Sequence, residues 1–256
     1  HVVQSFLNKP GGGGGPFPGA VEVANAPADG YTIGSFIIAV PVVGPNIGIP
    51  ELNPDPFEPL GNFLTYPFVI AAGADAPYDD IDGLAAYAKE NDVALGHFGA
   101  PLVPTQVTFA LAELRGFEYA SDAAFDALDC NTLASGDVDV INTTLQLILP
   151  CLDSVKVLAS IGNERISLTP NAPTVAELEP SLNVTLWNGL FVHKDTPADV
   201  RAKIIAVAEK TVMSEKAQAL AAETGALVYW QSADDVTAQI QADIATLGGI
   251  EKLLGE

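Results

Sequence analysis

The sequence predicts an α/β fold, because short apolar segments alternate with amphipathic helical segments along most of the chain. Apolar residues make up 48% of the 256 residues and charged residues 17%, which is the composition of a folded domain. This length suits one large domain or two small ones with a substantial core. From the alternation we expect mostly parallel sheets.

The expected elements follow in order. Strands are predicted at residues 2–6, 31–40, 63–72, 93–95, 117–120, 138–144, 155–160 and 186–192. Helices are predicted at residues 19–26, 79–88, 104–113, within 121–135, from 174, from 197, at 215–224 and at 232–247. Residues 41–59, rich in proline, glycine and asparagine, are predicted to form an irregular surface loop.

Specific residues mark the helix starts. Acidic side chains at 79–82 suit the positive end of a helix dipole, and Pro104 and Pro197 suit a first turn, where a missing N–H is no loss. Thr174, with Glu177 three residues later, forms a capping-box pattern. Glycine and proline interrupt the uncharged run 31–50 repeatedly, so we expect a buried strand and loop there and no membrane span.

The charge balance narrows the possible partners. The chain has 32 acidic and 11 basic residues, a formal net charge of −21. Such a molecule repels phosphate backbones and anionic lipid, so nucleic-acid and membrane-surface roles are not expected. Against this negative charge, an anionic ligand would need several hydrogen-bond donors concentrated at one place.

No metal or cofactor is predicted. Cys130 and Cys151 lack a zinc-site pattern, so they are either buried thiols or one disulfide, and two cysteines do not distinguish these alternatives. The glycine run 11–15 has neither GK[ST] nor GxGxxG, which leaves a mobile loop beside a cleft as the better interpretation.

The stretch 93–113 is the strongest candidate for a binding site. It is predicted to be a strand, a loop of small residues and a helix, in which the backbone at Gly99 can approach a bound group closely. The first turn of a helix leaves N–H groups unpaired and carries partial positive charge, which together suit an anion. An ordinary strand-to-helix connection is the alternative. The candidate contacts are Gly99, Ala100, Leu102, Val103, Pro104 and Thr105.

Further candidates lie near expected strand ends, where ligands gather in parallel α/β sheets. The strand at 138–144 ends in Asn142, Thr143 and Thr144, which either contact a ligand or form a satisfied turn. The remaining candidates are Ser35, Phe36, Phe17, Ser121, Asp122 and His97. A lone histidine is usually structural, and an aromatic after a glycine run is as often a loop anchor.

An enzyme is not expected, because the sequence contains no GxSxG or HExxH motif. A two-lobed hydrolase or transferase acting on a small acid is the rival hypothesis. Tight carboxylate binding without turnover would separate the two. A pure interaction module, with a dry lobe interface and no pocket, is the third.

Seven motifs together carry a family resemblance. They are ADGYT at 28–32, FEPL at 57–60, LAAYAK at 84–89, GDVD at 136–139, PTVAE at 173–177, WNGL at 187–190 and DTP at 195–197. In this order they resemble the periplasmic solute receptors of tripartite tricarboxylate transporters, also called Bug or TctC-type binding proteins.

The resemblance implies a two-lobed periplasmic-binding-protein fold, type II-like, with two crossing strands. Residues 61–72 would make the first crossing and 186–192 the return. One lobe would hold 1–68 and 190–256, and the other 69–189.

The resemblance also implies function. Members bind small carboxylates through backbone amides and waters at helix N-termini, which agrees with a chain that has only Arg115, Arg165 and Arg201. We therefore expect a periplasmic, monomeric receptor that closes around a small organic acid. Its partners would be the two membrane subunits of the transporter.

Two departures from the family pattern are expected to matter. The family's opening strand, Gly-Gly loop and helix is absent, so either the given chain is incomplete or the cleft is built differently. Residues 121–126 stand where relatives have a Pro-Tyr-Lys-Gly-Gly type loop. There Asp122 would disfavour a second carboxylate or favour an amine.

Overall fold

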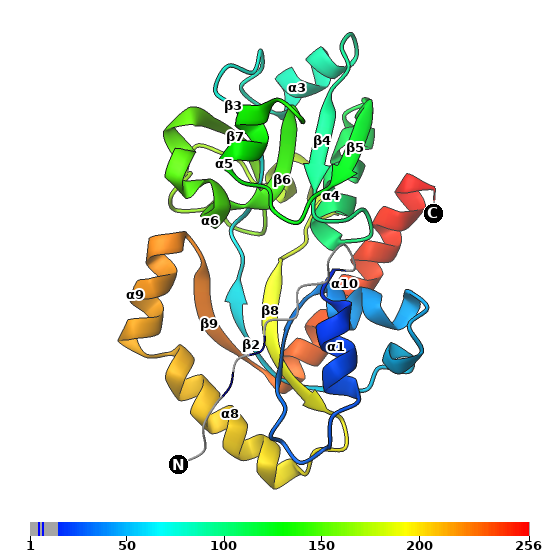
Figure 1. The fold of residues 1–256 in the computed structure, drawn as a ribbon, viewed down its shortest axis with the longest axis vertical. Helices are drawn as coiled ribbons and strands as arrows, with labels where there is room; N and C mark the ends of the chain where they lie inside the picture. The colour runs from blue at the N-terminus through cyan, green and yellow to red at the C-terminus, as the bar shows by residue number, and fades with distance from the viewer. Residues whose placement is uncertain (1–4, 6, 8–14, 256) are drawn as a thin grey trace.

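Two separate β-sheets, joined by two crossing segments, organise the computed structural model of the protein (Figure 1). The structure describes residues 5, 7 and 15–255. Sheet A has the strand order β1-β8-β2-β9 and sheet B the order β5-β4-β6-β3-β7. Most of the predicted strand at 2–6 and most of the glycine run lie outside the described residues.

The strands are β1 (Gly34–Ile37), β2 (Phe57–Thr65), β3 (Phe68–Gly73), β4 (Ala94–His97), β5 (Ser121–Ala124), β6 (Val140–Thr144), β7 (Val155–Ile161), β8 (Trp187–His193) and β9 (Leu227–Ser232). The helices are α1 (Phe17–Ala24), α2 (Ala39–Val43), α3 (Ile81–Ala88), α4 (Val103–Leu114), α5 (Cys130–Ser135), α6 (Leu145–Ile148), α7 (Val175–Leu178), α8 (Ala198–Val212), α9 (Glu215–Thr224) and α10 (Ala233–Leu254). Short 3-10 turns occupy Gly44–Asn46, Pro50–Leu52, Leu149–Ser154 and Pro180–Leu182.

The expectation of mostly parallel sheets is wrong. Every strand pair in sheet A is antiparallel, and in sheet B only β4–β5 and β4–β6 are parallel. A parallel pair requires a crossover between neighbours, and α4 and α5 provide such crossovers in sheet B. Neighbours in sheet A come from distant segments that run in opposite directions.

The predicted strand at 63–72 is two strands that belong to different sheets. β2 lies in sheet A and β3 in sheet B, and the chain passes between them at residues 66–67. Pro67 has no backbone N–H, so a ladder cannot continue through it. The return is made by residues 183–186. A hydrogen bond from the Tyr66 N–H to the Leu186 carbonyl (2.8 Å) joins the two crossing segments.

Three further expectations are corrected. The strand predicted at 31–40 is short, since α2 begins at Ala39, and the predicted loop 41–59 holds the rest of α2, two 3-10 turns and the start of β2. An apolar run alone does not distinguish a buried strand from a buried helix. The strand predicted at 117–120 lies at Ser121–Ala124, and β9 was not predicted.

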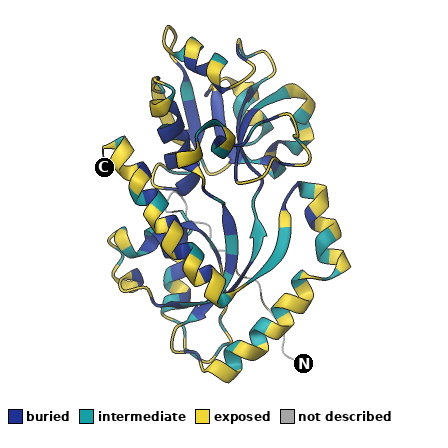
Figure 2. Ribbon diagram, turned by 180° about the vertical axis from the view of Figure 1, so that it is seen from behind, coloured by how far each residue is buried: buried dark blue, intermediate teal, exposed yellow. Residues whose placement is uncertain are grey.

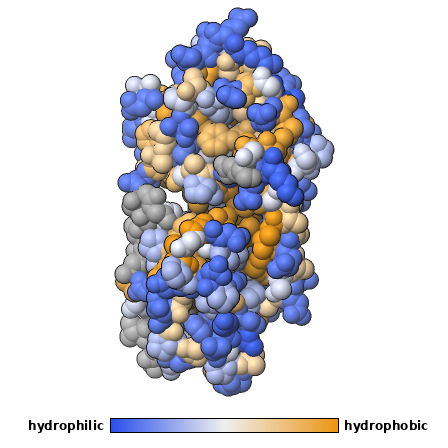
Figure 3. Space-filling view, turned by 90° about the vertical axis from the view of Figure 1, so that its right-hand side faces the viewer, coloured by the Kyte–Doolittle hydropathy of each residue, from blue (hydrophilic) through white to orange (hydrophobic). Residues whose placement is uncertain are grey.

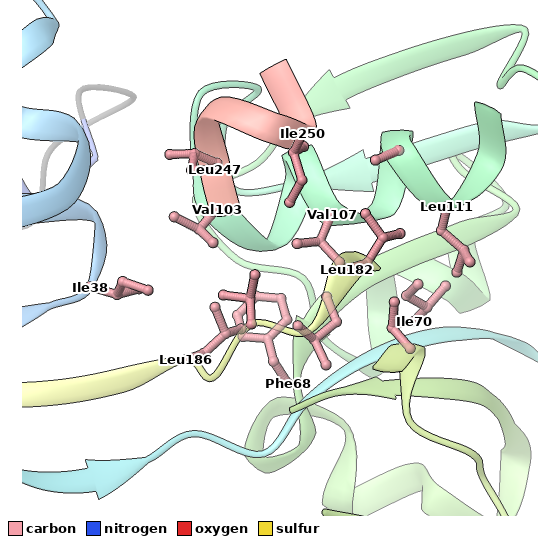
Figure 4. Close-up of a cluster of buried hydrophobic side chains, with 14 of the residues drawn as sticks. Ile38, Phe68, Ile70, Val103, Val107, Leu111, Leu182, Leu186, Leu247 and Ile250 are labelled. Carbon is pink, nitrogen blue, oxygen red and sulfur yellow. The ribbon is translucent and has the colours of Figure 1, made fainter. Parts of the chain in front are cut away.

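The core lies on both sheets and between them. Buried residues follow the strands, whereas the helices expose one face (Figure 2). α10 packs against β2 and β9 and also against α4 of the other half. Figure 4 shows the cluster at this junction, where Val103 lies near Ile38, Leu186 and Leu247. In the space-filling view, apolar side chains gather near the middle, where the halves meet (Figure 3).

Candidate functional site

The edge of sheet B where β4 and β6 end is the starting point for the site. These parallel strands end at His97 and Thr144, and β3 begins beside them, with Phe68 opposite Thr144. The turn from β4 to α4 leaves the sheet at this edge. The structure therefore places the predicted strand, turn and helix of 93–113 as expected.

The backbone of this turn presents unpaired donors. Gly99 has φ of +149°, a value that favours glycine, and Pro104 occupies the first turn of α4. The Leu102 carbonyl accepts the N–H groups of both Thr105 (2.9 Å) and Gln106 (3.0 Å). The N–H groups of Ala100 and Val103 have no acceptor among the residues that the structure describes. Two donors therefore remain at the positive end of a 12-residue helix.

Unpaired polar atoms gather beside these donors. Within the described part of the chain, the Oγ1 atom of Thr105, a fully buried residue, has no hydrogen-bond partner, and neither do the Oε1 of Gln106 and the Oδ1 of Asn142. Buried polar atoms without a partner are uncommon in folded proteins. Their other polar atoms fix the turn: Gln106 Nε2 donates to the Ala100 carbonyl (3.0 Å), and Asn142 Nδ2 donates to Thr108 Oγ1 (2.7 Å).

His97 is fully occupied by its neighbours. The buried ring accepts the Gly99 N–H at Nδ1 (3.0 Å), and its Nε2 lies 2.7 Å from Asp122 Oδ1. Because Nδ1 accepts, Nε2 carries the proton and donates to Asp122. The histidine therefore presents no free N–H to an anion.

Ser121 and Asp122 lie on β5, an exposed edge strand, and not in the loop that was predicted. Thr143 Oγ1 donates to the Leu128 carbonyl (2.7 Å) inside the core, whereas Thr144 is only partly buried. Asn142 and Thr143 thus have structural partners, as in the alternative of a satisfied turn. Whether any of these residues contacts a ligand stays a prediction.

The structure places the candidate ligand contacts from the other half, Phe36, Phe17 and Ser35, in different surroundings. Phe36 lies in the core, with ring centroids 4.7 Å from Phe57 and 5.4 Å from Phe191. Phe17 is buried too, and a Cβ on Gly15 would lie within 3.6 Å of both the Phe17 ring and Leu102. The start of α1 therefore approaches the β4–α4 turn.

Ser35 belongs to a chain of side-chain hydrogen bonds at the crossing. Its hydroxyl donates to Asn188 Oδ1 (3.0 Å), and Asn188 Nδ2 donates to the Tyr66 hydroxyl. Burial raises the pKa of Tyr66 to about 12, so its phenol stays protonated. Ser35 therefore binds a crossing strand in this structure.

A cavity of about 630 Å³ lies between the halves and was missed by sequence reasoning. Residues from both crossing segments line it, with the loop after β7, β9 and the start of α10. Both tryptophans of the chain, Trp187 and Trp230, are lining residues. The β4–α4 turn does not line it, and the turn is closed to solvent at Thr105. The β-branched and aromatic run at 227–230 is the sequence signal that could have revealed β9.

A buried carboxylate stands behind this cavity. Asp243 of α10 accepts hydrogen bonds from Trp187 Nε1 (2.8 Å) and Gln239 Nε2 (2.9 Å). Burial raises the pKa of Asp243, and the two hydrogen bonds oppose that shift. This contact fastens α10 to the crossing strand β8.

Arginine side chains are engaged elsewhere. Arg115 pairs with Asp82 and Glu179, Arg165 with Glu177, and Arg201 with Glu58.

Within the described part of the chain, no cluster of three or more metal-ligating side chains occurs. Among the helices described, none is long and apolar enough to cross a bilayer. Cys130 and Cys151 form a disulfide, which resolves the alternative left open by the sequence.

Comparison with known proteins gives a consistent set of relatives. A protein of Pseudomonas sp. strain P51, "UPF0065 protein in tcbD-tcbE intergenic region", is 27% identical over 97% of this chain and 70% of its own length. The Cupriavidus necator "UPF0065 protein in gbd 5'region" is 28% identical over 77% of this chain. The aligned region is 61% of that relative's length, so the chain spans less than two thirds of it.

Solved structures share the fold. Rpa4515 of R. palustris, solved with adipate, superposes with a TM-score of 0.81 at 20% identity over 92% of this chain and 82% of that one. The periplasmic binding protein BugD gives 0.81 at 24% identity over 93% and 83%. MatC from Rhodopseudomonas palustris, with bound malate, gives 0.76 at 23% identity over 91% and 83%. The chain therefore has the predicted two-lobed periplasmic-binding-protein fold.

The family model described as "Tripartite tricarboxylate transporter family receptor" (TctC) matches residues 2–255. This family consists of receptors, so the rival hypothesis of a hydrolase or transferase is not supported. The chain belongs to the TctC family of solute receptors.

Proposed function

We propose that the protein binds a small organic carboxylate between its two lobes and delivers it to the membrane subunits of a tripartite tricarboxylate transporter. Membership of the receptor family supports the partnership. The adipate bound to Rpa4515 and the malate bound to MatC support the ligand class. The disulfide supports an extracytoplasmic location, since disulfides persist in oxidising compartments. A monomeric state stays part of the proposal.

The observation that carries the proposed site is the group of unpaired donors on the β4–α4 turn. The N–H groups of Ala100 and Val103 have no acceptor among the described residues and can donate to a carboxylate, and the unpartnered hydroxyl of Thr105 lies in the first turn of the same helix. All three arginines are ion-paired elsewhere. Main-chain recognition also suits a chain whose net charge is −21.

Closure of the two lobes would exclude water from the bound ligand. The lobes of the proposal are 1–68 with 190–256, and 69–189. The membership of the strands in sheets A and B supports a division into two lobes, with Phe68 in sheet B and residues 187–189 in sheet A. The crossing segments 66–67 and 183–186 lie outside regular structure and would absorb the rotation. Thr105 is fully buried in this structure, so a ligand reaches its hydroxyl only when the lobes move apart.

Ligand screening followed by one substitution tests the site. A thermal-shift screen of mono- and dicarboxylates, aromatic acids and amino acids should give hits that raise the melting temperature. For the best hit, Thr105→Val should weaken binding about tenfold or more, since a hydrogen bond to a charged group is removed. Thr105→Ser keeps the hydroxyl and should bind within about threefold of the parent.

Stability and affinity are separable in this design. Valine replaces an unpartnered hydroxyl by a methyl of similar shape, so the unliganded melting temperature should stay equal or rise. Calorimetric affinities that are the same for Thr105→Val and Thr105→Ser would place the pocket elsewhere. A screen in which no carboxylate binds would contradict the function itself.

A further inference from the structure

Helix α10 links the two halves of the molecule a third time, beside the two crossing segments. It follows β9 and packs against β2, β9 and α2 on one side, and also against α4 and the 3-10 turn Pro180–Leu182 of the other half (Figure 1). We propose that the pair Gly248–Gly249 is a hinge at which this helix bends when the lobes move apart. The inference rests on the lobe movement of the proposed function and adds to it a device that permits that movement.

The first part of α10 is fixed to the lobe of sheet A. Ser232 is both the last residue of β9 and the N-cap of the helix, and it lies opposite Gly61 of β2. Val236 is fully buried, and Asp243 accepts the indole N–H of Trp187 in β8 (2.8 Å). These contacts hold the helix on sheet A as far as residue 243.

The last part of α10 lies on the lobe of sheet B. Ile250 is 2% exposed and points toward Val107 of α4 and toward Leu182 (Figure 4). One turn further on, Leu254 lines a groove together with Phe109 of α4. The residues that follow Gly249 are therefore attached to the second lobe.

Gly248 and Gly249 lie between these two attachments, and the local structure requires a glycine at neither position. Neither residue has a positive φ, so no left-handed conformation is needed. A Cβ at either position would meet no atom of the described residues within 4 Å, so no close approach of another segment excludes a side chain. Glycine nevertheless weakens the interior of a helix, because its backbone keeps more freedom than that of alanine. The property that the pair supplies is a place where α10 bends easily.

A straight and rigid α10 would oppose opening of the lobes. Its last turns would have to leave α4, which would expose Ile250 and the apolar side chains beneath it to water, or the helix would hold the lobes together. A bend at the glycine pair preserves both attachments, because the end of the helix can then move with the second lobe. Opening would therefore sacrifice few apolar contacts.

Replacing both glycines by alanine, as Gly248→Ala with Gly249→Ala, tests the hinge. Alanine fits the open space and favours a helix, so the melting temperature should rise by about 4 °C. The matched control is Thr237→Ala, at an exposed position in the first part of the same helix. This substitution also raises helix propensity but leaves the glycine pair unchanged.

Single-molecule energy transfer measures lobe opening without a ligand. Both cysteines of the chain are joined in the disulfide, so Asn46→Cys and Asp126→Cys, at exposed positions of the two lobes, each take a dye. We expect the alanine pair to slow opening about tenfold, and Thr237→Ala to leave the rate within about threefold of the parent. Equal opening rates for the parent and the alanine pair would overturn the inference, and so would a parent that does not open.

Ligand binding separates this inference from the proposed function. For the best carboxylate of the screen, association measured by stopped-flow fluorescence should slow in the alanine pair by the same factor as opening, because the ligand enters the open form. If the parent opens and the alanine pair slows that opening, but no carboxylate binds, the proposed function fails while the hinge is supported. A carboxylate that binds the parent and the alanine pair at the same rate would contradict the hinge and leave the ligand class intact.

Discussion

At the scale of single residues, Asp243 shows how a buried charge can be tolerated at a hinge. Its carboxylate accepts two hydrogen bonds, from Trp187 and Gln239, while burial raises its pKa above the ordinary value of 3.8. For an acid, a raised pKa in the folded state means that the protonated form is the better tolerated one. Its contribution to stability is therefore largest below the unfolded-state pKa. It decreases as the pH rises through the folded-state pKa.

Asp243→Asn tests this pH dependence. The amide is neutral at every pH and its oxygen can still accept from Trp187, so the variant lacks the cost of ionisation. We expect the free energy of unfolding of the variant, relative to the parent, to increase between pH 4 and pH 7. Urea unfolding at several pH values measures the difference, in which shared effects of the net charge cancel. A difference that is flat over this range would contradict the assignment of a raised pKa.

At the scale of elements, the disulfide ties the start of α5 to the turn before β7. Cys130 and Cys151 are separated by 21 positions, so the bond closes a loop that the unfolded chain would otherwise sample freely. A loop of this size is worth about 3 kcal/mol in the chain-entropy model. Reduction should therefore lower the melting temperature by several degrees.

Differential scanning calorimetry with and without dithiothreitol measures this effect. A variant with both Cys130→Ser and Cys151→Ser is the control, because it should melt at the reduced temperature whether or not the reductant is present. An unchanged melting temperature for the reduced parent would show that the bond does not constrain the unfolded chain.

Helix starts are the elements that the sequence predicted best. Asp80 accepts the Gly83 N–H at the start of α3, and the capping box of Thr174 and Glu177 is formed at α7. These signals are local, so they can be recognised without the rest of the molecule. The β4–α4 turn was predicted for the same reason, from Gly99 and Pro104.

Strand boundaries and side-chain partners depended on distant residues. β5 is exposed along its whole length, so no apolar pattern marks it, and only pairing with β4 makes it a strand. The partner of His97 lies 25 residues away, and the register between β4 and β5 brings it into contact. The cavity was missed because β9 and the break at Pro67 were missed.

At the scale of the whole molecule, the fluorescence of the two tryptophans can report movement of the lobes. Both tryptophans line the cavity that lies between the halves, and Trp187 is buried next to a crossing segment. Closure around a ligand would change the solvation of these indoles. We expect a shift in tryptophan emission when a carboxylate binds, together with a smaller radius of gyration by small-angle scattering.

Trp230→Phe and Trp187→Phe assign the signal to one side of the cavity. Trp230 is partly exposed, so most of the change should be lost with it. A ligand of proven affinity that leaves both the emission and the scattering profile unchanged would contradict lobe closure. It would favour binding to a rigid molecule.

The position of β8 in sheet A has a consequence for the order of events during synthesis. Sheet B is assembled from one continuous segment, from β3 to β7, whereas β8 lies between β1 and β2, which precede it by more than a hundred residues. Sheet A therefore cannot be completed before sheet B has left the ribosome. We expect sheet B to gain structure first, with the slow, long-range pairing of sheet A following it. Pulse-labelling hydrogen exchange during refolding would reveal this sequence as earlier protection of amides in β3–β7.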